Sequence, residues 1–189
     1  QAEGVDYIVV VTPYYLRPSA DELVEHYTAV CRSVNLPVLA YNIPERTGVE
    51  LTPGALRRIR ESCENFVGLK DSSGRLDQIP ELVAAGLAVF IGRDHMILEG
   101  LKRGCVGAVT ACANVAPRAF VELYNAHRAA DLDRAARLQA LVEPLRGQVR
   151  LLRVGNGVLA TGALHTAVQL ACTRCLVEFQ LPVNFDIEE

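Results

Sequence analysis

The chain has 189 residues, of which half are hydrophobic and 22% are charged, a balance that fits a soluble globular protein able to bury a core. Its net charge of -3 gives nucleic-acid binding no bulk electrostatic support. No apolar stretch approaches the ~20 residues that a helix needs to cross a bilayer, so we expect no membrane partner.

Five short apolar runs rich in β-branched residues alternate with amphipathic segments along the chain. Ser19 and Glu22 form a capping-box pattern at the start of the first amphipathic segment, and Asp131 or Asp133 begins the last. This alternation predicts βαβ units and a parallel sheet. The predicted strands are residues 7–11, 37–41, 66–70, 87–91 and 106–110, and the predicted helices are 20–33, one opening at 52–53, 76–85, 94–102 and 116–129.

The number of units leaves two α/β architectures open. A doubly wound sheet fits five strands directly, although its phosphate-loop glycine patterns are absent from this sequence. A closed (β/α)8 barrel needs eight units and about 250 residues.

The pattern changes after about residue 150. Apolar and polar residues alternate with period two over 164–170 and again over 179–187, which predicts a short antiparallel β segment. We therefore divide the chain into an α/β part, 1–150, and a β-rich part, 151–189, that contains one Cys-x-x-Cys pair, Cys172 and Cys175.

The six cysteines and the amino-terminal residues point to a cellular compartment. The cysteines are widely spaced except for the last two, which is not the spacing of a small disulfide framework. No basic and apolar leader precedes the first strand. We therefore expect a cytoplasmic protein with reduced thiols.

Only two of the 19 basic residues are lysines, and one of them, Lys70, ends the third predicted strand. Arginine stays charged in proteins, whereas lysine can lose its proton and act as a nucleophile. The carboxyl ends of parallel strands share one edge of a sheet, where active sites collect. The residues expected at that edge are Tyr14, Tyr15, Tyr41, Asn42, Lys70, Asp71, Asp94 and Thr110.

These residue types suit an enzyme that forms a Schiff base with a ketone. Lys70 supplies the amine, Tyr41 a proton shuttle, and Arg46 a cation for a substrate carboxylate. Each also has a structural reading: a lysine at a strand end is often solvated or salt-bridged, tyrosines there often only pack, and Arg46 could be a plain surface residue of a loop. Spacing alone leaves both readings open.

Four ordered motifs resemble the dihydrodipicolinate synthase / N-acetylneuraminate lyase family. They are Thr12-Pro13-Tyr14-Tyr15, Tyr41-Asn42-Ile43-Pro44-Glu45-Arg46-Thr47-Gly48, Gly68-Leu69-Lys70-Asp71-Ser72-Ser73-Gly74, and Gly107-Ala108-Val109-Thr110 with Ala113-Asn114-Val115. The resemblance covers about residues 1–150 and corresponds to strands four to eight of the family's (β/α)8 barrel. It implies a partial barrel that lacks the first three strands, and hence low activity of this chain alone.

The resemblance also implies roles for five residues and a set of partners. Lys70 matches the amine that binds pyruvate as a covalent imine, with no separate cofactor. Tyr41 matches the central proton relay, and Tyr15 the tyrosine that a neighbouring subunit lends to it, which implies a homo-oligomer. Arg46 matches the residue that binds the second substrate's carboxylate, and Val109 a position lining the pyruvate pocket. The small-molecule partners would be pyruvate and an aldehyde.

The family resemblance implies a pyruvate-dependent lyase, most directly a 4-hydroxy-tetrahydrodipicolinate synthase in lysine biosynthesis that uses aspartate semialdehyde. Related 2-keto-3-deoxy sugar acid and 4-hydroxy-2-oxoglutarate aldolases carry the same lysine motif and remain alternatives. Leu16 departs from the asparagine common in the synthases.

The segment from about 155 to 189 resembles the start of a small bacterial family linked to accumulation of large-subunit ribosomal RNA. That resemblance implies a further alternative, a non-catalytic module or an inactive truncated or fused product. Cys172 and Cys175 are candidate metal ligands, but zinc needs four, so no metal is assigned.

Overall fold

The structure, a computed structural model, describes residues 4–143, 150–154, 157–161, 165–171 and 178–184. The chain forms two compact units, Gln1–Val109 and Thr110–Glu189. The division near residue 150 stays a prediction.

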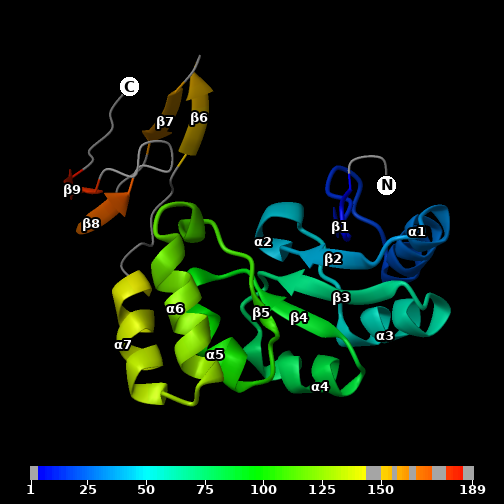
Figure 1. The fold of residues 1–189 in the computed structure, drawn as a ribbon. Coiled ribbons are helices and arrows are strands. Elements are labelled where there is room, and N and C mark those ends of the chain that lie inside the picture. Colours follow the sequence, from blue (N-terminus) through cyan, green and yellow to red (C-terminus); the bar gives the residue numbers. More distant parts are fainter. Residues whose placement is uncertain (1–3, 144–149, 155–156, 162–164, 172–177, 185–189) are drawn as a thin grey trace. The chain divides into compact units, whose positions relative to one another are not determined.

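The first unit contains a parallel sheet of five strands. Their order across the sheet, β1-β2-β3-β4-β5, follows the sequence, as successive βα units dictate (Figure 1). This confirms the predicted α/β class and parallel sheet. The strands are β1 (Ile8–Val11), β2 (Val38–Asn42), β3 (Phe66–Asp71), β4 (Ala88–Ile91) and β5 (Gly107–Ala108).

The fifth strand is shorter than predicted. The sequence predicts a strand over 106–110, but only Gly107 and Ala108 are paired with β4 as a strand. Val106 and Val109 still donate backbone hydrogen bonds to Val89 and Ile91 of β4, at 2.9 and 2.8 Å. The residues on either side of β5 therefore also run alongside β4.

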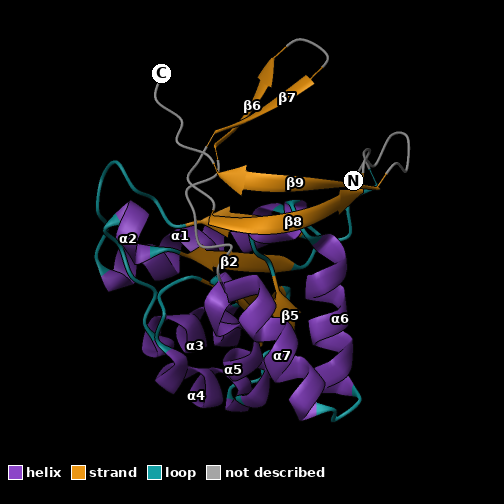
Figure 2. Ribbon diagram, turned by 90° about the vertical axis from the view of Figure 1, so that its left-hand side faces the viewer, coloured by secondary structure: helices purple, strands orange, loops and turns teal. Residues whose placement is uncertain are grey.

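Helices and 3-10 turns connect the strands, and Figure 2 shows them in purple against the orange strands. Two predicted helices, 76–85 and 94–102, each begin with a 3-10 turn. A one-turn helix that the sequence did not predict follows β2. The helices of this unit are α1 (Ala20–Ser33), α2 (Pro44–Thr47), α3 (Pro53–Ser62), α4 (Ile79–Ala84) and α5 (Ile97–Lys102), with 3-10 turns at Leu76–Gln78 and Asp94–Met96.

The two longest helices of this unit start at capping residues visible in the sequence. The Ser19 backbone N–H donates to Glu22 at 2.7 Å, and the Glu22 N–H donates back to the Ser19 hydroxyl at 3.3 Å. The Ser19 hydroxyl also donates to the Glu22 carboxylate, at 2.9 Å, and the two hydrogen bonds that this carboxylate accepts from Ser19 lower its pKa. Thr52 caps α3, and Pro53 occupies its first turn, where a missing N–H costs nothing. The predicted helix starts are therefore confirmed.

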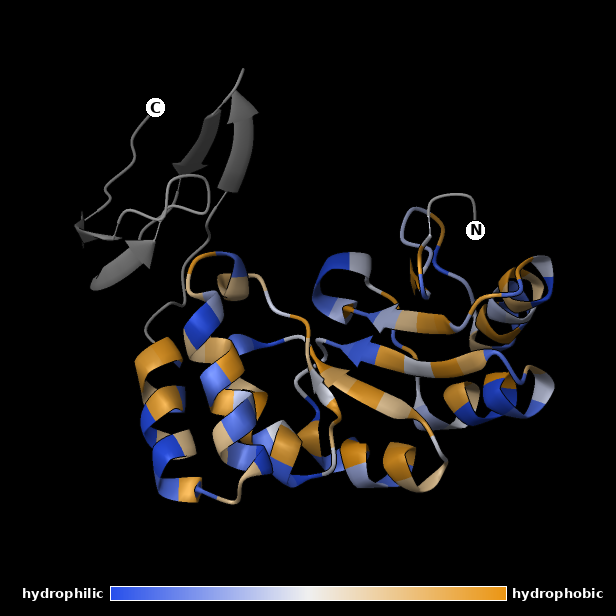
Figure 3. Ribbon diagram, viewed as in Figure 1, coloured by the Kyte–Doolittle hydropathy of each residue, from blue (hydrophilic) through white to orange (hydrophobic). Residues whose placement is uncertain are grey.

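One face of the sheet forms the core with these helices. Tyr27 of α1 is fully buried, donates its hydroxyl to the Val10 carbonyl at 2.9 Å, and packs edge-on against Phe66. The opposite face carries Val9 and Val11, which are 49% and 39% exposed. Figure 3 shows the apolar colours of β3 giving way to blue at its carboxyl end.

Burial in this core also affects two thiols. Burial, with a contribution from the neighbouring Cys63, raises the pKa of Cys31 to about 12, and burial with the charge of Asp71 raises the pKa of Cys105 to about 12. An unfolded thiol has a pKa of about 8.5, so the unfolded chain loses these protons first. The contribution of these protonated thiols to the free energy of unfolding is thus fully present below about pH 8.5 and falls as the pH rises toward 12.

We expect urea midpoints at pH 10 to be lower than at pH 8, and Cys105→Ala to reduce that difference. Equal pH dependence in the variant and the parent would contradict the assignment to this thiol.

Among its described residues, the second unit has two α-helices and two antiparallel pairs of strands. Asp131 accepts a hydrogen bond from the Arg134 N–H at 3.0 Å, so the last helix begins after Asp131 and not after Asp133. β8 (His165–Ala171) pairs antiparallel with β9 (Glu178–Asn184), as predicted. The other elements are α6 (Pro117–Arg128), α7 (Leu132–Val142), a 3-10 turn at Cys112–Asn114, and an unpredicted pair, β6 (Arg150–Val154) with β7 (Gly157–Thr161).

Within the residues described, no helix is both long and apolar enough to span a membrane. Cys172 and Cys175 lie outside the described residues.

Candidate active site

The register of the sheet places Tyr41 and Lys70 side by side. Val11 pairs with Tyr41, Tyr41 with Lys70, Lys70 with Phe90, and Phe90 with Gly107, so one row of residues crosses all five strands. Side chains of a row share one face because strand residues alternate. A register shift between Val38 and Leu39 contributes to this alignment, and no pattern in the sequence predicts that shift.

The amine of Lys70 lies over the Tyr41 ring, with Nζ 4.0 Å from the ring centroid. This distance is that of a cation–π contact, in which the negative ring face attracts the ammonium group. The contact holds a long, flexible side chain in one place at the carboxyl edge of the sheet. The structure thus joins the amine and the phenol that the sequence placed on the same edge.

Lys70 makes no ion pair within the described part of the chain, so of the two structural readings of its position, solvated or salt-bridged, the second is not seen there. The chain's other lysine, Lys102 of α5, lies 3.8 Å from the carboxylate of Glu99. Lys70 is also half-buried, whereas Lys102 is exposed. The two lysines therefore have different environments, and that of Lys70 suits a reactive amine.

Space for the Lys70 side chain depends on Gly92, the residue after β4. A Cβ at this position would lie 2.0 Å from the Ser72 hydroxyl oxygen and 3.1 Å from Lys70 Cε. A methyl group there would displace both side chains, because contacts this short are repulsive.

Arg46 lies on α2, directly after β2. Gly48 ends this helix in the left-handed conformation, with φ of 65°, which glycine adopts at little cost, and donates its N–H to the Pro44 carbonyl at 2.8 Å. Arg46 is exposed and occupies the last turn. Arg46 therefore follows the carboxyl end of β2, the strand that carries Tyr41.

Arg93 connects α2 to the loop that follows Lys70, a role that sequence reasoning missed. Its Nε donates to the Ser72 carbonyl at 2.8 Å, and a terminal nitrogen bonds the Glu45 carboxylate at 2.5 Å. The hydrogen bond from Arg93 lowers the pKa of Glu45. These partners lie 21 and 48 residues away, so no local motif could have revealed them.

The two remaining predicted residues are not brought into contact with Lys70. Tyr15, in the loop after β1, is 91% exposed, and Val109, directly after β5, is 45% exposed. Val109 lies two strands away from β3 along the same edge of the sheet.

Asn42 and Asp71, which share the carboxyl edge with Lys70 but were given no role, are buried and hydrogen-bonded to each other at 2.9 Å. In the residues described, no group of three or more His, Cys, Asp or Glu side chains is arranged to hold a metal ion.

The model of the dihydrodipicolinate synthetase family matches residues 1–170. The chain belongs to this family. Its five-stranded sheet with helices corresponds to part of the family's TIM barrel, because solved structures of the family superpose on 75% of the chain. The chain spans about half the length of the curated relatives it matches.

Two curated relatives of this family member carry the same name. It is 40% identical over 146 residues to the 4-hydroxy-tetrahydrodipicolinate synthase of Methanothrix thermoacetophila, a match covering 75% of this chain and 49% of the relative. The enzyme of that name from Archaeoglobus fulgidus is 37% identical over 145 residues, covering 75% of this chain and 50% of the relative.

Two solved structures illustrate the likeness. The 4-hydroxy-tetrahydrodipicolinate synthase of Methylacidiphilum fumariolicum SolV is 35% identical, with a TM-score of 0.73, and the match covers 75% of this chain and 48% of that one. A prophage protein of the family from E. coli K12, solved in complex with pyruvate, is 31% identical with a TM-score of 0.72, over 76% of this chain and 50% of that one.

Proposed function

We propose that Lys70 forms an imine with pyruvate and that the chain belongs to a pyruvate-dependent lyase. The observation that carries the proposal is the Lys70 amine, which makes no ion pair among the described residues and lies 4.0 Å from the ring centroid of Tyr41 at the carboxyl edge of the sheet. The pyruvate complex of the related prophage protein supports the choice of ketone. The names of the relatives support 4-hydroxy-tetrahydrodipicolinate synthesis, with aspartate semialdehyde as second substrate.

In the first step, the neutral Lys70 amine attacks C2 of pyruvate. A C–N bond forms, the carbonyl electron pair moves to oxygen, and one proton passes from nitrogen to that oxygen. The resulting hydroxyl group then takes a second proton and leaves as water, which gives the protonated imine. The Tyr41 hydroxyl carries these protons, because its ring already lies against the amine.

The other residues complete the proposal at positions that the fold allows. Arg46 binds the carboxylate of the second substrate, since guanidinium recognises carboxylates. Val109 lines the pyruvate pocket. Tyr15 is exposed and meets the relay of a neighbouring subunit, so the working form is a homo-oligomer. No separate cofactor takes part.

The experiment is reductive trapping on the full chain. Incubation with pyruvate and cyanoborohydride should place a reduced pyruvyl group on the peptide that contains Lys70, as detected by mass spectrometry after digestion. Absence of the adduct on folded protein would overturn the proposal. Where the adduct forms, consumption of aspartate semialdehyde supports the synthase, and turnover only of keto-deoxy sugar acids rejects it.

A further inference from the structure

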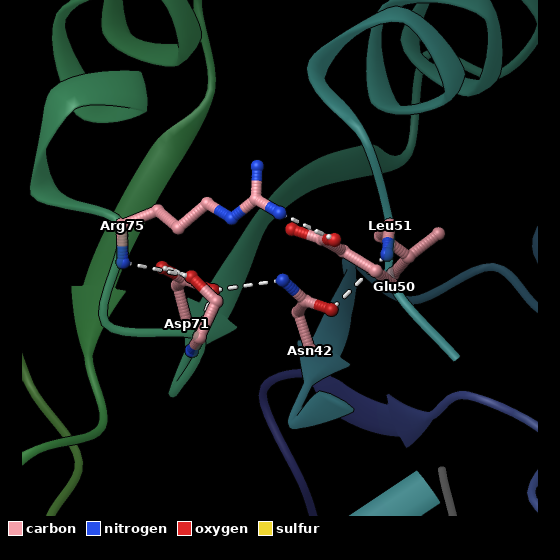
Figure 4. Close-up of polar contacts among 6 residues, drawn as sticks. Asn42, Glu50, Leu51, Asp71 and Arg75 are labelled. Carbon is pink, nitrogen blue, oxygen red and sulfur yellow. Dashed lines mark hydrogen bonds and ion pairs between the residues drawn. The ribbon is translucent and has the colours of Figure 1, made fainter. Parts of the chain in front are cut away.

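A closed ring of polar contacts lies beside the Tyr41–Lys70 pair (Figure 4). At its centre, Asn42 Nδ2 donates to Asp71 Oδ1 at 2.9 Å. The amide oxygen of Asn42, Oδ1, accepts a hydrogen bond from the Leu51 N–H at 3.1 Å. The Asp71 carboxylate also accepts from Ser73, from its N–H at 3.2 Å and its hydroxyl at 2.8 Å.

An ion pair at the surface closes the ring. The Arg75 N–H donates to the Ser73 hydroxyl oxygen at 3.1 Å, and the Arg75 guanidinium bonds Glu50 at 3.0 Å. Glu50 precedes Leu51 in the chain, so the contacts return to their start. The ring thereby ties the loop after α2 to the loop after β3.

The central pair is buried, whereas the closing ion pair is more open to solvent. Asn42 is 2% exposed and Asp71 is 7% exposed. Buried polar groups are costly unless each is hydrogen-bonded, and a buried carboxylate without donors is costlier still. The Asn42–Asp71 contact is therefore the part of the ring on which the local arrangement of the strands depends.

This pair and the reactive pair are consecutive rungs of the same two strands. Tyr41 pairs with Lys70 in the register, and Asn42 pairs with Asp71 directly after them. Successive side chains point to opposite faces, so the amide and carboxylate lie on the face away from the Lys70 amine. They cannot touch a ketone bound to Lys70, but their contact, together with the backbone hydrogen bond from the Ser72 N–H to the Asn42 carbonyl at 2.8 Å, joins the two strand ends that carry Tyr41 and Lys70.

We propose that Asn42 and Asp71 are positioning residues for imine formation, acting through the strand ends to hold the Tyr41 phenol against the Lys70 amine. This inference rests on the proposed function. Its physical basis is that a misplacement of about 1 Å between reacting groups can cost about a hundredfold in rate. A pair with only a structural role would change stability and leave the rate of the folded protein unchanged.

The test replaces the amide and the carboxylate one at a time. In Asn42→Asp, two buried carboxylates face each other, and a like charge this close raises the pKa of one of them. Trapping is therefore measured above that raised pKa, where both groups are charged and their repulsion moves the strand ends apart. In Asp71→Asn, the amide of Asn42 still has an oxygen to donate to, so the geometry is nearly kept. Asp71 Oδ1 also accepts from the Ser73 N–H, so the new amide keeps its oxygen at that position, and its nitrogen takes the place of Oδ2 beside the Ser73 hydroxyl, which can accept as well as donate.

The readout is the rate of pyruvate trapping by cyanoborohydride on the full chain, measured over a range of pyruvate concentrations. We expect Asn42→Asp to lower the maximal rate about tenfold to a hundredfold, with the half-saturating pyruvate concentration changed by less than about threefold. Asp71→Asn should remain within about threefold of the parent.

Asn65→Asp is the matched control for lost stability. Asn65 precedes β3 at the end opposite Lys70, and its Nδ2 donates to the carbonyls of Cys31, Val34 and Leu36 at 2.9, 3.2 and 3.2 Å. A carboxylate facing three carbonyl oxygens destabilises the fold without touching the reactive pair. We expect this variant to unfold at lower urea concentration and to trap pyruvate at the parental rate under native conditions.

Three outcomes separate the possibilities. No adduct on the parent rejects the proposed function itself. An adduct on the parent that Asn42→Asp forms at the parental rate overturns the positioning role. Equal slowing by Asn65→Asp and Asn42→Asp, or slowing by Asp71→Asn as large as that by Asn42→Asp, also overturns it, because the effect would then not follow the geometry of the pair.

Discussion

Lys70→Arg should lower the rate of pyruvate trapping by about a thousandfold or more, to the background of the remaining amines. Arginine keeps the positive charge and can lie over the Tyr41 ring as lysine does, so the fold is retained. It does not lose its proton, however, and so cannot attack a carbonyl. The measurement is the mass of the reduced adduct over time, with circular dichroism to show that the variant is folded.

Lys102→Arg is the control for this prediction, because Lys102 is the only other lysine in the chain. It lies at the end of α5 and pairs with Glu99, an interaction that arginine can keep. The variant should trap pyruvate at the parental rate. A normal adduct on Lys70→Arg, or its loss in Lys102→Arg, would place the reactive amine elsewhere.

Gly68→Ala should lower the free energy of unfolding by about 3 kcal/mol or more, the upper range for overpacked cores. Gly68 lies in β3 opposite Ala88 of β4. A Cβ at Gly68 would lie 2.0 Å from the Ala88 carbonyl oxygen and 2.8 Å from its carbonyl carbon. These are backbone atoms of a paired strand, so relief requires the two strands to move. Urea unfolding followed by circular dichroism measures the loss.

Gly54→Ala makes the same chemical change where there is room for it. Gly54 lies in the first turn of α3, and a Cβ there meets no atom within 4 Å. Because alanine lowers the entropy of the unfolded chain, this variant should gain about 0.4 to 1 kcal/mol. Similar urea midpoints for the two variants would show that β3 and β4 do not approach as closely as described.

The parallel sheet could be predicted because its strands are apolar runs of ordinary length. The two longest helices that pack on it begin at capping residues that the sequence shows. Ser19 and Thr52 are local signals, each fulfilled within three residues of the chain. The helix α2 escaped prediction because a single turn is too short for helical periodicity, although Pro44 and Gly48 mark its two ends.

The candidate site was only partly predictable, for a different reason. That Tyr41 and Lys70 share an edge follows from parallel strands, but their alignment as neighbours depends on a register shift that pairing alone decides. The contacts of Arg93 and of Asn42 with Asp71 join segments 21 to 48 residues apart. Such partners become visible only when the strands are placed in the sheet.

The position of the Lys70 amine over the Tyr41 ring also has an optical consequence. The chain contains no tryptophan and six tyrosines, so phenol rings dominate its absorption in the near ultraviolet. A charge 4.0 Å from one ring centroid perturbs that ring more than a distant charge does. The proposed conversion of the amine into an imine would change the group that faces Tyr41. The near-ultraviolet absorption of this tyrosine would then report imine formation without an added label.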